Sequence, residues 1–558
     1  MGIRGGNLMI KNKRLSLLVT GFASMMVLAA CGGANSDGAA EDVAADETAG
    51  GVLNVQVDVE VATMDPQMAT DGTSFEVIAN TIEGLYTLDE SGVAVPSLAE
   101  KTDVSEDGLT YTFTLKDATW SNGTPVTADD FVYAWQRLAD PDTASEYYYI
   151  MGIAGVVNAD EISAGEKDPE ELGVTAIDEK TLEVKLNHPV PFFESLMAFP
   201  SFFPMNQAFF EEAGENYGTS ADTLIANGAF EITSYEPAAT TIELEKNPDY
   251  FDAENVSLDG IKYQVIKDTQ QAMLSYQNGD LDVVTLAGEQ VDLFKDDPEF
   301  QTIQAGYLWY ISPNTKVPGL ENANLRKALG QAFDKEYIAE TVLKDGSNAA
   351  DYMIPEGLAV DPEGVDFRET TGTYLEFDPA AAQEALELAK EELGKDSFTF
   401  TMIIEDTESS INVAQVLKSQ IEENLDGVTV EIEQMPKKTR LDRMNVGDYE
   451  LALTRWGPDY ADPMTYADMF LTDSGNNKGF WSNAKYDELV NSSLDGELSL
   501  DPEARWTALQ EAESIILEDA GILPVYQKGN AVMVKSNVTG VDFHTVGVSR
   551  IVKNAVKE

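Results

Sequence analysis

Segments with the apolar pattern of strands and segments with the pattern of helices alternate along nearly the whole of this chain. Residues 52–57 and 109–115 place apolar side chains at every second position, as half-buried strands do. Residues 325–343 and 380–393 place them three and four positions apart, as amphipathic helices do. Regular alternation of the two patterns is typical of α/β domains, so we expect that fold class.

The same patterns locate further elements. Thr127 is a favourable N-cap for a helix that continues to Arg137, because a Thr side chain can accept a hydrogen bond from a free N–H group of the first turn. Further predicted elements are helices at 74–86 and 413–425 and strands at 181–186, 398–404 and 428–432.

The charge of the chain limits its possible partners. Its 558 residues suffice for about two to four domains. They include 98 acidic against 36 basic residues, a formal net charge of −62. A surface this negative repels DNA, RNA and anionic lipid headgroups, so we exclude nucleic-acid binding.

Few residues of this chain could perform redox, metal or nucleophilic chemistry. Cys31 is the single cysteine, which excludes an intramolecular disulfide, and the two histidines, His188 and His544, lie far apart in the sequence. No nucleophile motif, zinc motif or phosphate-binding loop is present. We therefore expect no cofactor and no enzymatic activity. A glycosidase that uses two carboxylates is the enzymatic alternative, although carboxylate pairs occur by chance among so many acids.

The N-terminus has the pattern of a lipoprotein leader. Basic residues within 11–14 precede an apolar run at 15–28, which is as long as the core of a signal peptide and short for a membrane span. The sequence LAAC at 28–31 resembles the lipobox of bacterial lipoproteins. We expect residues 1–30 to be a signal peptide and Cys31 to carry acyl chains such as palmitate. An ordinary signal peptide with a chance cysteine is the alternative.

The lipidated cysteine and a flexible linker would occupy residues 31–51. This stretch is rich in Gly, Ala and acids and has no aromatic residue, a composition that cannot bury a core. Gly32 stands where an Asp can mark retention at an inner membrane. We therefore expect the protein on the extracytoplasmic face of the cell membrane, in a Gram-positive bacterium with a single membrane.

Several motifs, in order along the chain, resemble one family. They are 111–137 (YTFTLKDATWSNGTPVTADDFVYAWQR), 247–251 (NPDYF), 261–284, 325–335 and 455–463 (RWGPDYADP). Together they are similar to the extracellular solute-binding proteins of peptide and nickel ABC importers, of the oligopeptide-binding type.

The resemblance implies a two-lobed, periplasmic-binding-protein-like fold. An extra domain would enlarge the first lobe, giving three domains, and the lobes would close over ligand about a hinge. The implied limits are 52–95, 205–311 and 511–558 for domain I, 96–204 for domain II and 312–510 for domain III.

The function implied by the resemblance is capture of oligopeptides outside the cell. A monomer, held at the membrane through its lipid anchor, would deliver them to the permease and ATPase subunits of an ABC importer. Other ligands stay open, namely a dipeptide, a peptide pheromone, a nickel chelate or a sugar, as does a role as signalling receptor or adhesin.

The motif at 455–463 contains the main candidate for ligand binding. By the resemblance, Asp459 would accept the α-ammonium group of a peptide, since a carboxylate binds an ammonium through charge-assisted hydrogen bonds. Trp456 and Gly457 would offer stacking and backbone contacts, and Tyr460 lies beside them.

A loop of the first lobe and several aromatic residues complete the candidate site. The backbone of the loop would pair with the peptide backbone as an added strand does. The loop residues are Thr70, Asp71 and Gly72, and the aromatic candidates are Tyr147, Tyr307 and Trp309, for each of which core packing is the alternative.

The sequence does not identify the basic residue that would bind the C-terminal carboxylate of the peptide. Lys437, Lys438, Arg440 and Arg443 form a local basic cluster in a chain with few bases. They could bind that carboxylate or pair with the surrounding acids.

Overall fold

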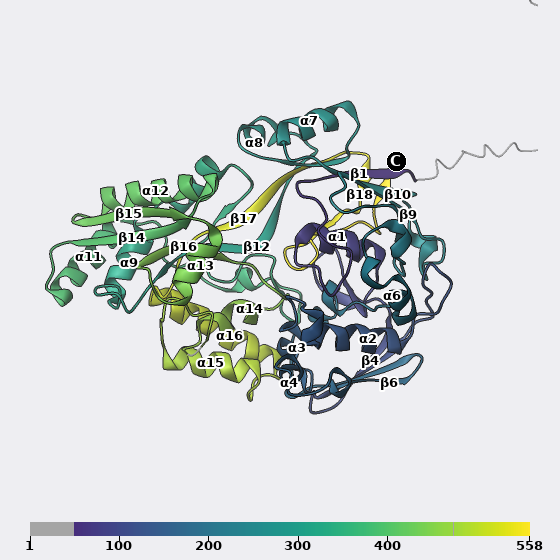
Figure 1. Cartoon of the computed structure of the whole chain (residues 1–558). Coiled ribbons are helices and arrows are strands. Elements are labelled where there is room, and N and C mark those ends of the chain that lie inside the picture. The colour runs from purple at the N-terminus through teal and green to yellow at the C-terminus, as the bar shows by residue number, and fades with distance from the viewer. Residues whose placement is uncertain (1–49, 473) are drawn as a thin grey trace, which may run out of the picture. The chain divides into compact units, whose positions relative to one another are not determined.

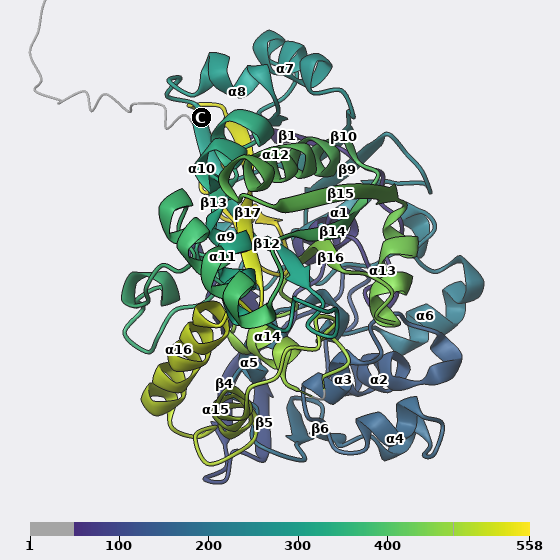
Figure 2. The same ribbon diagram turned by 90° about the vertical axis from the view of Figure 1, so that its left-hand side faces the viewer.

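The computed structural model describes residues 50–472 and 474–558, with the elements labelled in Figures 1 and 2. Cys31, the predicted signal peptide and nearly all of the predicted linker lie outside the described residues. Within the described ranges, no helix combines the length and the apolar character needed to cross a membrane.

One mixed sheet of eleven strands runs through the described residues. Its order is β15-β14-β16-β12-β17-β11-β1-β10-β9-β8, with β13 paired to β17. Parallel pairs, such as β1 with β10 and β14 with β15, stand beside antiparallel ones, such as β12 with β17. The bounds are β1 Val52–Val57, β8 Phe230–Ser234, β9 Thr241–Lys246, β10 Gly260–Val265, β11 Val283–Leu286, β12 Phe300–Pro313, β13 Asn348–Ala349, β14 Phe398–Glu405, β15 Val428–Met435, β16 Leu451–Trp456 and β17 Leu523–Val534.

The long strands β12 and β17 connect the two ends of this sheet. Their pairing is interrupted by register shifts between Gln304 and Leu308 and between Trp309 and Tyr310, and the first of these is the larger. Past the first shift β12 pairs with β16, whereas the last residues of β17 pair with β11. Figure 1 shows both strands extending from the β14–β16 part toward the β1–β10 part. Because a strand bends readily at such an irregularity, this crossing is our candidate hinge. The predicted boundary at 311/312 falls within β12, and the domain limits stay a prediction.

Helices cover the β14–β16 part of the sheet. In both views α12 lies along β14 and β15, with α9 and α11 nearby (Figures 1 and 2). Leu329, Leu386 and Leu417 from these three helices are buried in one apolar core with the strands. The bounds of the helices between residues 323 and 445 are α9 Ala323–Gln331, α11 Pro379–Leu393, α12 Glu408–Asn424 and α13 Lys437–Asn445. Three later helices pack on one another, namely α14 Met464–Ala467, α15 Ala484–Leu494 and α16 Pro502–Glu518. The combination confirms the predicted α/β class.

A smaller antiparallel sheet, in the order β4-β5-β7-β6, lies within the segment predicted as domain II. Helix α2 packs against β6 and β7. As predicted, Thr127 is its N-cap, in a capping box with Asp130. The bounds are β4 Ala99–Val104, β5 Thr110–Leu115, β6 Val174–Asp178, β7 Thr181–Lys185 and α2 Ala128–Ala139.

Two predicted helices differ from the structure. Helix α1 spans Gly72–Thr81 rather than 74–86, because its last carbonyl, that of Thr81, accepts the N–H of Gly228 from a distant segment. Residues 325–343 do not form one helix. The chain breaks after α9, and Asp334 caps a new start, α10 Lys335–Tyr337, which continues as a π-helical turn.

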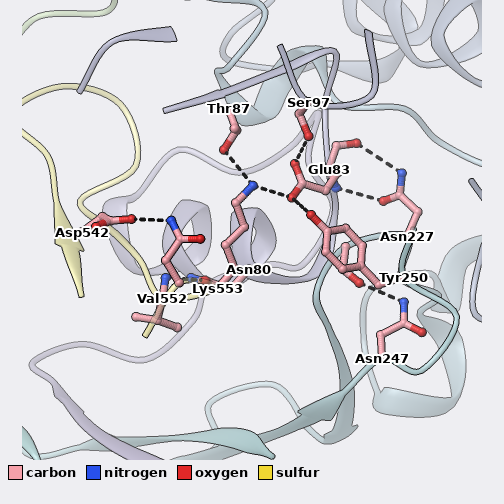
Figure 3. Close-up of polar contacts among 12 residues, drawn as sticks. Asn80, Glu83, Thr87, Ser97, Asn227, Asn247, Tyr250, Asp542, Val552 and Lys553 are labelled. Carbon is pink, nitrogen blue, oxygen red and sulfur yellow. Dashed lines mark hydrogen bonds and ion pairs between the residues drawn. The ribbon is translucent and has the colours of Figure 1, made fainter. Parts of the chain in front are cut away.

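Residues near the C-terminus of the chain form hydrogen bonds with α1. Arg550 donates two hydrogen bonds to the Glu76 carboxylate, at 2.7 and 2.9 Å, and the N–H of Val552 donates to Asn80 at 3.0 Å (Figure 3 shows Asn80 and Val552). These contacts satisfy two buried polar side chains of the helix.

Just beyond α1, buried Glu83 is the centre of a second polar contact. Its carboxylate accepts from Lys553 at 2.7 Å, from Tyr250 at 2.8 Å and from Ser97 (Figure 3). Burial raises the pKa of Glu83, but Lys553 and the hydroxyl donors outweigh it, so the pKa lies below the usual value of Glu. Both ends of the described chain therefore contribute to the same lobe.

Candidate functional site

A cavity of about 1140 Å³ is lined by segments that are far apart in the sequence. It is bounded by the end of β1, the start of α1, the irregular part of β12, the middle of β17, the start of α12, the loop after β16 and residues 543–550. The structure brings together at this cavity the predicted residues Thr70, Gly72, Tyr147, Tyr307, Gly457 and Asp459.

Asp459 is a carboxylate without a partner among the described residues. Its backbone N–H donates to the Thr465 hydroxyl at 3.2 Å, which fixes the loop after β16. Burial alone raises the pKa of the Asp459 carboxyl to about 6. A desolvated carboxylate that lines a cavity and has no counter-charge is arranged to bind a cation.

The loop 457–459 packs directly on the irregular part of β12. A Cβ on Gly457 would lie 2.2 Å from Cε1 of Tyr307, and a Cβ on Gly306 would lie 2.5 Å from Cγ of Pro458. A side chain at Gly457 would have to displace the Tyr307 ring, and one at Gly306 would also meet the backbone carbonyl oxygen of Thr545 at 2.8 Å.

Tyr466 ties the same loop to β12, and sequence reasoning missed it. Its buried hydroxyl lies 2.5 Å from the Gly306 carbonyl oxygen and 3.0 Å from that of Trp456, and accepts the N–H of Leu308 at 3.2 Å. Because these partners belong to β12 and to the last residue of β16, the hydroxyl fixes the start of the loop that carries Asp459 against β12.

Aromatic side chains form a wall of the cavity near Asp459. Phe75, Tyr147 and Phe199 line it and pack on one another, with ring centroids 4.9–5.8 Å apart. The pKa values of Tyr147 and Tyr149 are raised by burial and then by the negative charge of Asp459. Tyr147 was predicted. Phe75 and Phe199 were missed, because an apolar aromatic residue in a helix or loop first suggests core packing.

Two predicted residues near the cavity have structural contacts instead of lining it. Asp71 caps α1, with its side chain accepting the N–H of Ser74 at 2.9 Å. The Trp456 indole N–H donates to the carbonyl oxygen of Thr465 at 3.0 Å. Their role as ligand contacts stays a prediction.

The other two predicted residues outside the cavity lining are packed against aromatic rings. Trp309 is buried and stacked on Tyr526, with ring centroids 5.5 Å apart. Tyr460 is buried and stacked on Phe192, with centroids 4.1 Å apart. Both side chains are packed in the core, and their role as ligand contacts stays a prediction.

The basic cluster at 437–443 does not line the cavity. Its ion pairs are Arg440–Glu405 at 2.9 Å, Arg443–Glu433 at 2.8 Å and Lys438–Asp442 at 2.8 Å. The bases that do line the cavity are Lys267, Lys528 and Arg550, which no sequence pattern singled out. Within the described ranges, no group of His, Cys, Asp or Glu is arranged to hold a metal ion.

Comparison with known proteins gives a consistent result. Residues 93–478 match the model of bacterial extracellular solute-binding proteins, family 5 (middle). The chain is 32% identical to the dipeptide-binding protein of Lactococcus lactis over 90% of this chain and 94% of the relative. It is 30% identical to the oligopeptide-binding protein OppA of Bacillus subtilis over 95% and 97%.

Solved structures agree with these sequence matches. Listeria monocytogenes OppA bound to peptide superposes with a TM-score of 0.71 at 35% identity, covering 91% of this chain and 99% of that one. The substrate-binding domain of an oligopeptide ABC transporter from Bacillus anthracis gives 0.71 at 40% identity, covering 91% and 98%. Both the sequence and the two-lobed fold thus have close counterparts.

Proposed function

This chain belongs to family 5 of the bacterial extracellular solute-binding proteins, the oligopeptide-type receptors of ABC importers, and on this premise we propose that it captures oligopeptides outside the cytoplasmic membrane and delivers them to a permease. The relatives reported above are named for dipeptides or oligopeptides. A cavity of about 1140 Å³ is large for a dipeptide or a metal chelate, which supports an oligopeptide.

The observation that carries this proposal is the unpartnered carboxylate of Asp459 in the cavity wall. An α-ammonium group is the one cation that every unmodified peptide has. In a desolvated site, its charge-assisted hydrogen bond to Asp459 is strong, and it discriminates against ligands without a free amine.

Backbone pairing would hold the rest of the ligand. Thr70, Gly72 and Gly457 line the cavity, and their backbone groups can pair with an extended peptide without reading its side chains. The aromatic wall of Phe75, Tyr147 and Phe199 would take the first side chains. Closure about β12 and β17 would then exclude water from these contacts.

We further propose that Cys31 carries the lipid that keeps the receptor at the membrane. Metabolic labelling with palmitate should mark the wild-type protein and not the Cys31→Ala variant, which should be found in the culture medium. Equal label on both would contradict the anchor without affecting the peptide site.

The test of peptide capture is direct. Receptor purified from growing cells should release peptides on heat denaturation, identified by mass spectrometry, and calorimetry should detect binding of free-amine peptides but not of their N-acetyl forms. Release of a sugar or a nickel chelate instead would redirect the ligand assignment. Steady turnover of peptides or glycans by the pure protein would favour the enzymatic alternative. Unchanged peptide uptake after deletion of the gene would favour a signalling receptor or adhesin.

A further inference from the structure

The basic side chains that line the cavity are all bound to acids. The pairs are Arg550 with Glu76 at 2.7 Å, Lys267 with Glu60 at 2.9 Å, and Lys528 with Asp345. Both members of the Arg550 pair are almost fully buried. Taking the guanidinium away from Glu76 would leave a buried carboxylate unpaired, at a cost that a ligand contact does not recover.

His544, which also lines the cavity, is engaged on both ring nitrogens. Nδ1 lies 3.1 Å from the carbonyl oxygen of Val548, and Nε2 lies 2.9 Å from that of Asp89. Both nitrogens are within hydrogen-bond distance of backbone carbonyl oxygens, so the ring has no free N–H to offer a ligand carboxylate.

The acids of the lining are in excess. Five carboxylates line the cavity against the three bases. Asp58, Glu408 and Asp459 have no ion-pair partner in the part of the chain that the structure describes. Asp58 follows β1, Glu408 begins α12 and Asp459 follows β16, so the unpaired charge comes from three separate segments of the lining.

From this imbalance, and resting on the proposed peptide binding, we infer that the receptor recognises the amino end of its ligand and provides no base for the C-terminal carboxylate. The ligand class is therefore peptides with a free α-amine whose far end is neutral or cationic. C-terminally amidated peptides, or longer chains whose carboxylate lies outside the cavity, fulfil this condition. A free carboxylate inside the cavity meets a net negative wall and is repelled.

Lys267 is the base that could contradict this inference. Its side chain is 64% exposed, and an exposed ion pair holds its members weakly, so Lys267 is free to leave Glu60 for a ligand. The paired Lys528 is less exposed, at 34%. Both lysines therefore belong in the test.

The experiment compares trialanine, tetra-alanine and penta-alanine, each as free acid, as C-terminal amide and as N-acetyl acid, by calorimetry on the whole protein. At low ionic strength we expect each amide to bind about threefold to tenfold more tightly than its acid. The gap should shrink in added salt, which screens the repulsion. The N-acetyl forms should lose at least a hundredfold.

The Lys267→Gln and Lys528→Gln variants should keep this order, as should Lys101→Gln, a control at an exposed pair with Asp103. An amide that binds tenfold or more weakly than its acid would overturn the inference, decisively so if either cavity variant removed the difference. In that case, weaker binding of the N-acetyl peptides would still support the proposed peptide binding through a free amine. If neither the acids nor the amides bind at any length, the proposed function itself fails.

Discussion

The ring of Tyr307 covers the backbone of Gly457 so closely that a side chain there would collide with it, at 2.2 Å from Cε1. Tyr307 belongs to the irregular part of β12, and Gly457 begins the loop that ends in Asp459. The candidate hinge and the candidate amine site are therefore in direct contact.

Gly457→Ala should displace Tyr307 or the loop and weaken tetra-alanine binding about tenfold or more, because overpacking of this kind costs about 1–3 kcal/mol. The double variant with Gly457→Ala and Tyr307→Ala has no such clash and should regain much of the affinity. Gly475→Ala is the control, since an added Cβ there meets nothing within 4 Å. Wild-type affinity of the Gly457→Ala variant in calorimetry would contradict the contact's importance.

Peptide affinity should depend on pH through Asp459. The ammonium binds the ionised carboxylate, and burial raises the pKa of that carboxyl to about 6 in the free receptor. Affinity should therefore fall about tenfold per pH unit below that pH, be nearly constant up to about pH 7, and decline again near pH 8, where the peptide α-ammonium, with an ordinary pKa of about 8, loses its proton. Asp459→Asn should bind about 100-fold more weakly at neutral pH and lose the pH dependence on the acid side. Titration calorimetry between pH 4.5 and 8 measures both, and a flat wild-type profile would exclude Asp459 as the amine ligand.

Tyr466→Phe should loosen the loop that carries Asp459. Loss of its hydroxyl leaves the Leu308 N–H and two carbonyl groups with fewer partners, at about 1–3 kcal/mol of the free energy of unfolding. Peptide affinity should fall as well. Tyr449→Phe is the matched control, because its buried hydroxyl donates to the Lys478 carbonyl oxygen and does not touch the cavity. A loss of stability without a loss of affinity in Tyr466→Phe would limit that hydroxyl to a structural role.

Glu83→Gln should destabilise the protein by about 3–5 kcal/mol, because it leaves the Lys553 ammonium without its buried counter-charge. The folded-state pKa of Glu83 lies below its unfolded value, so its contribution is complete above the unfolded value and is lost as the pH falls through the folded one. The difference between variant and wild type in the free energy of unfolding, measured with urea, should accordingly become smaller below about pH 4.5. The exposed pair Lys101–Asp103 is the control, and Lys101→Gln should cost less than about 1 kcal/mol.

Local pattern identified much of the fold. The predicted strands at 52–57, 109–115 and 181–186 coincide closely with β1, β5 and β7, since alternation is a property of each strand alone. The prediction of one continuous helix at 325–343 was wrong. The side chain of Asp334 caps the N-terminus of a new helix, so the first helix ends although the apolar pattern continues.

At the candidate site, the sequence could not predict contacts that depend on packing between distant segments. Asp459 could be singled out because a motif surrounds it, whereas the contacts of the Tyr466 hydroxyl with Leu308 and Gly306 bridge about 160 residues of sequence. Trp309, whose role as a ligand contact stays a prediction, illustrates the same limit. It lies two positions after Tyr307, but its stretch of β12 is buried among other elements, so an aromatic residue there stacks on Tyr526 within the core.

The attachment of α1 to residues 550–553 also sets an order of assembly. A chain that emerges N-terminus first from a membrane channel displays Glu76, Asn80 and Glu83 long before Arg550, Val552 and Lys553 exist to satisfy them. The first lobe therefore cannot reach its final state until the last residues have crossed. A copy that ends before residue 550 lacks the two cations that neutralise the buried carboxylates of Glu76 and Glu83, so its first lobe is less stable and more open to proteolysis than that of the complete chain.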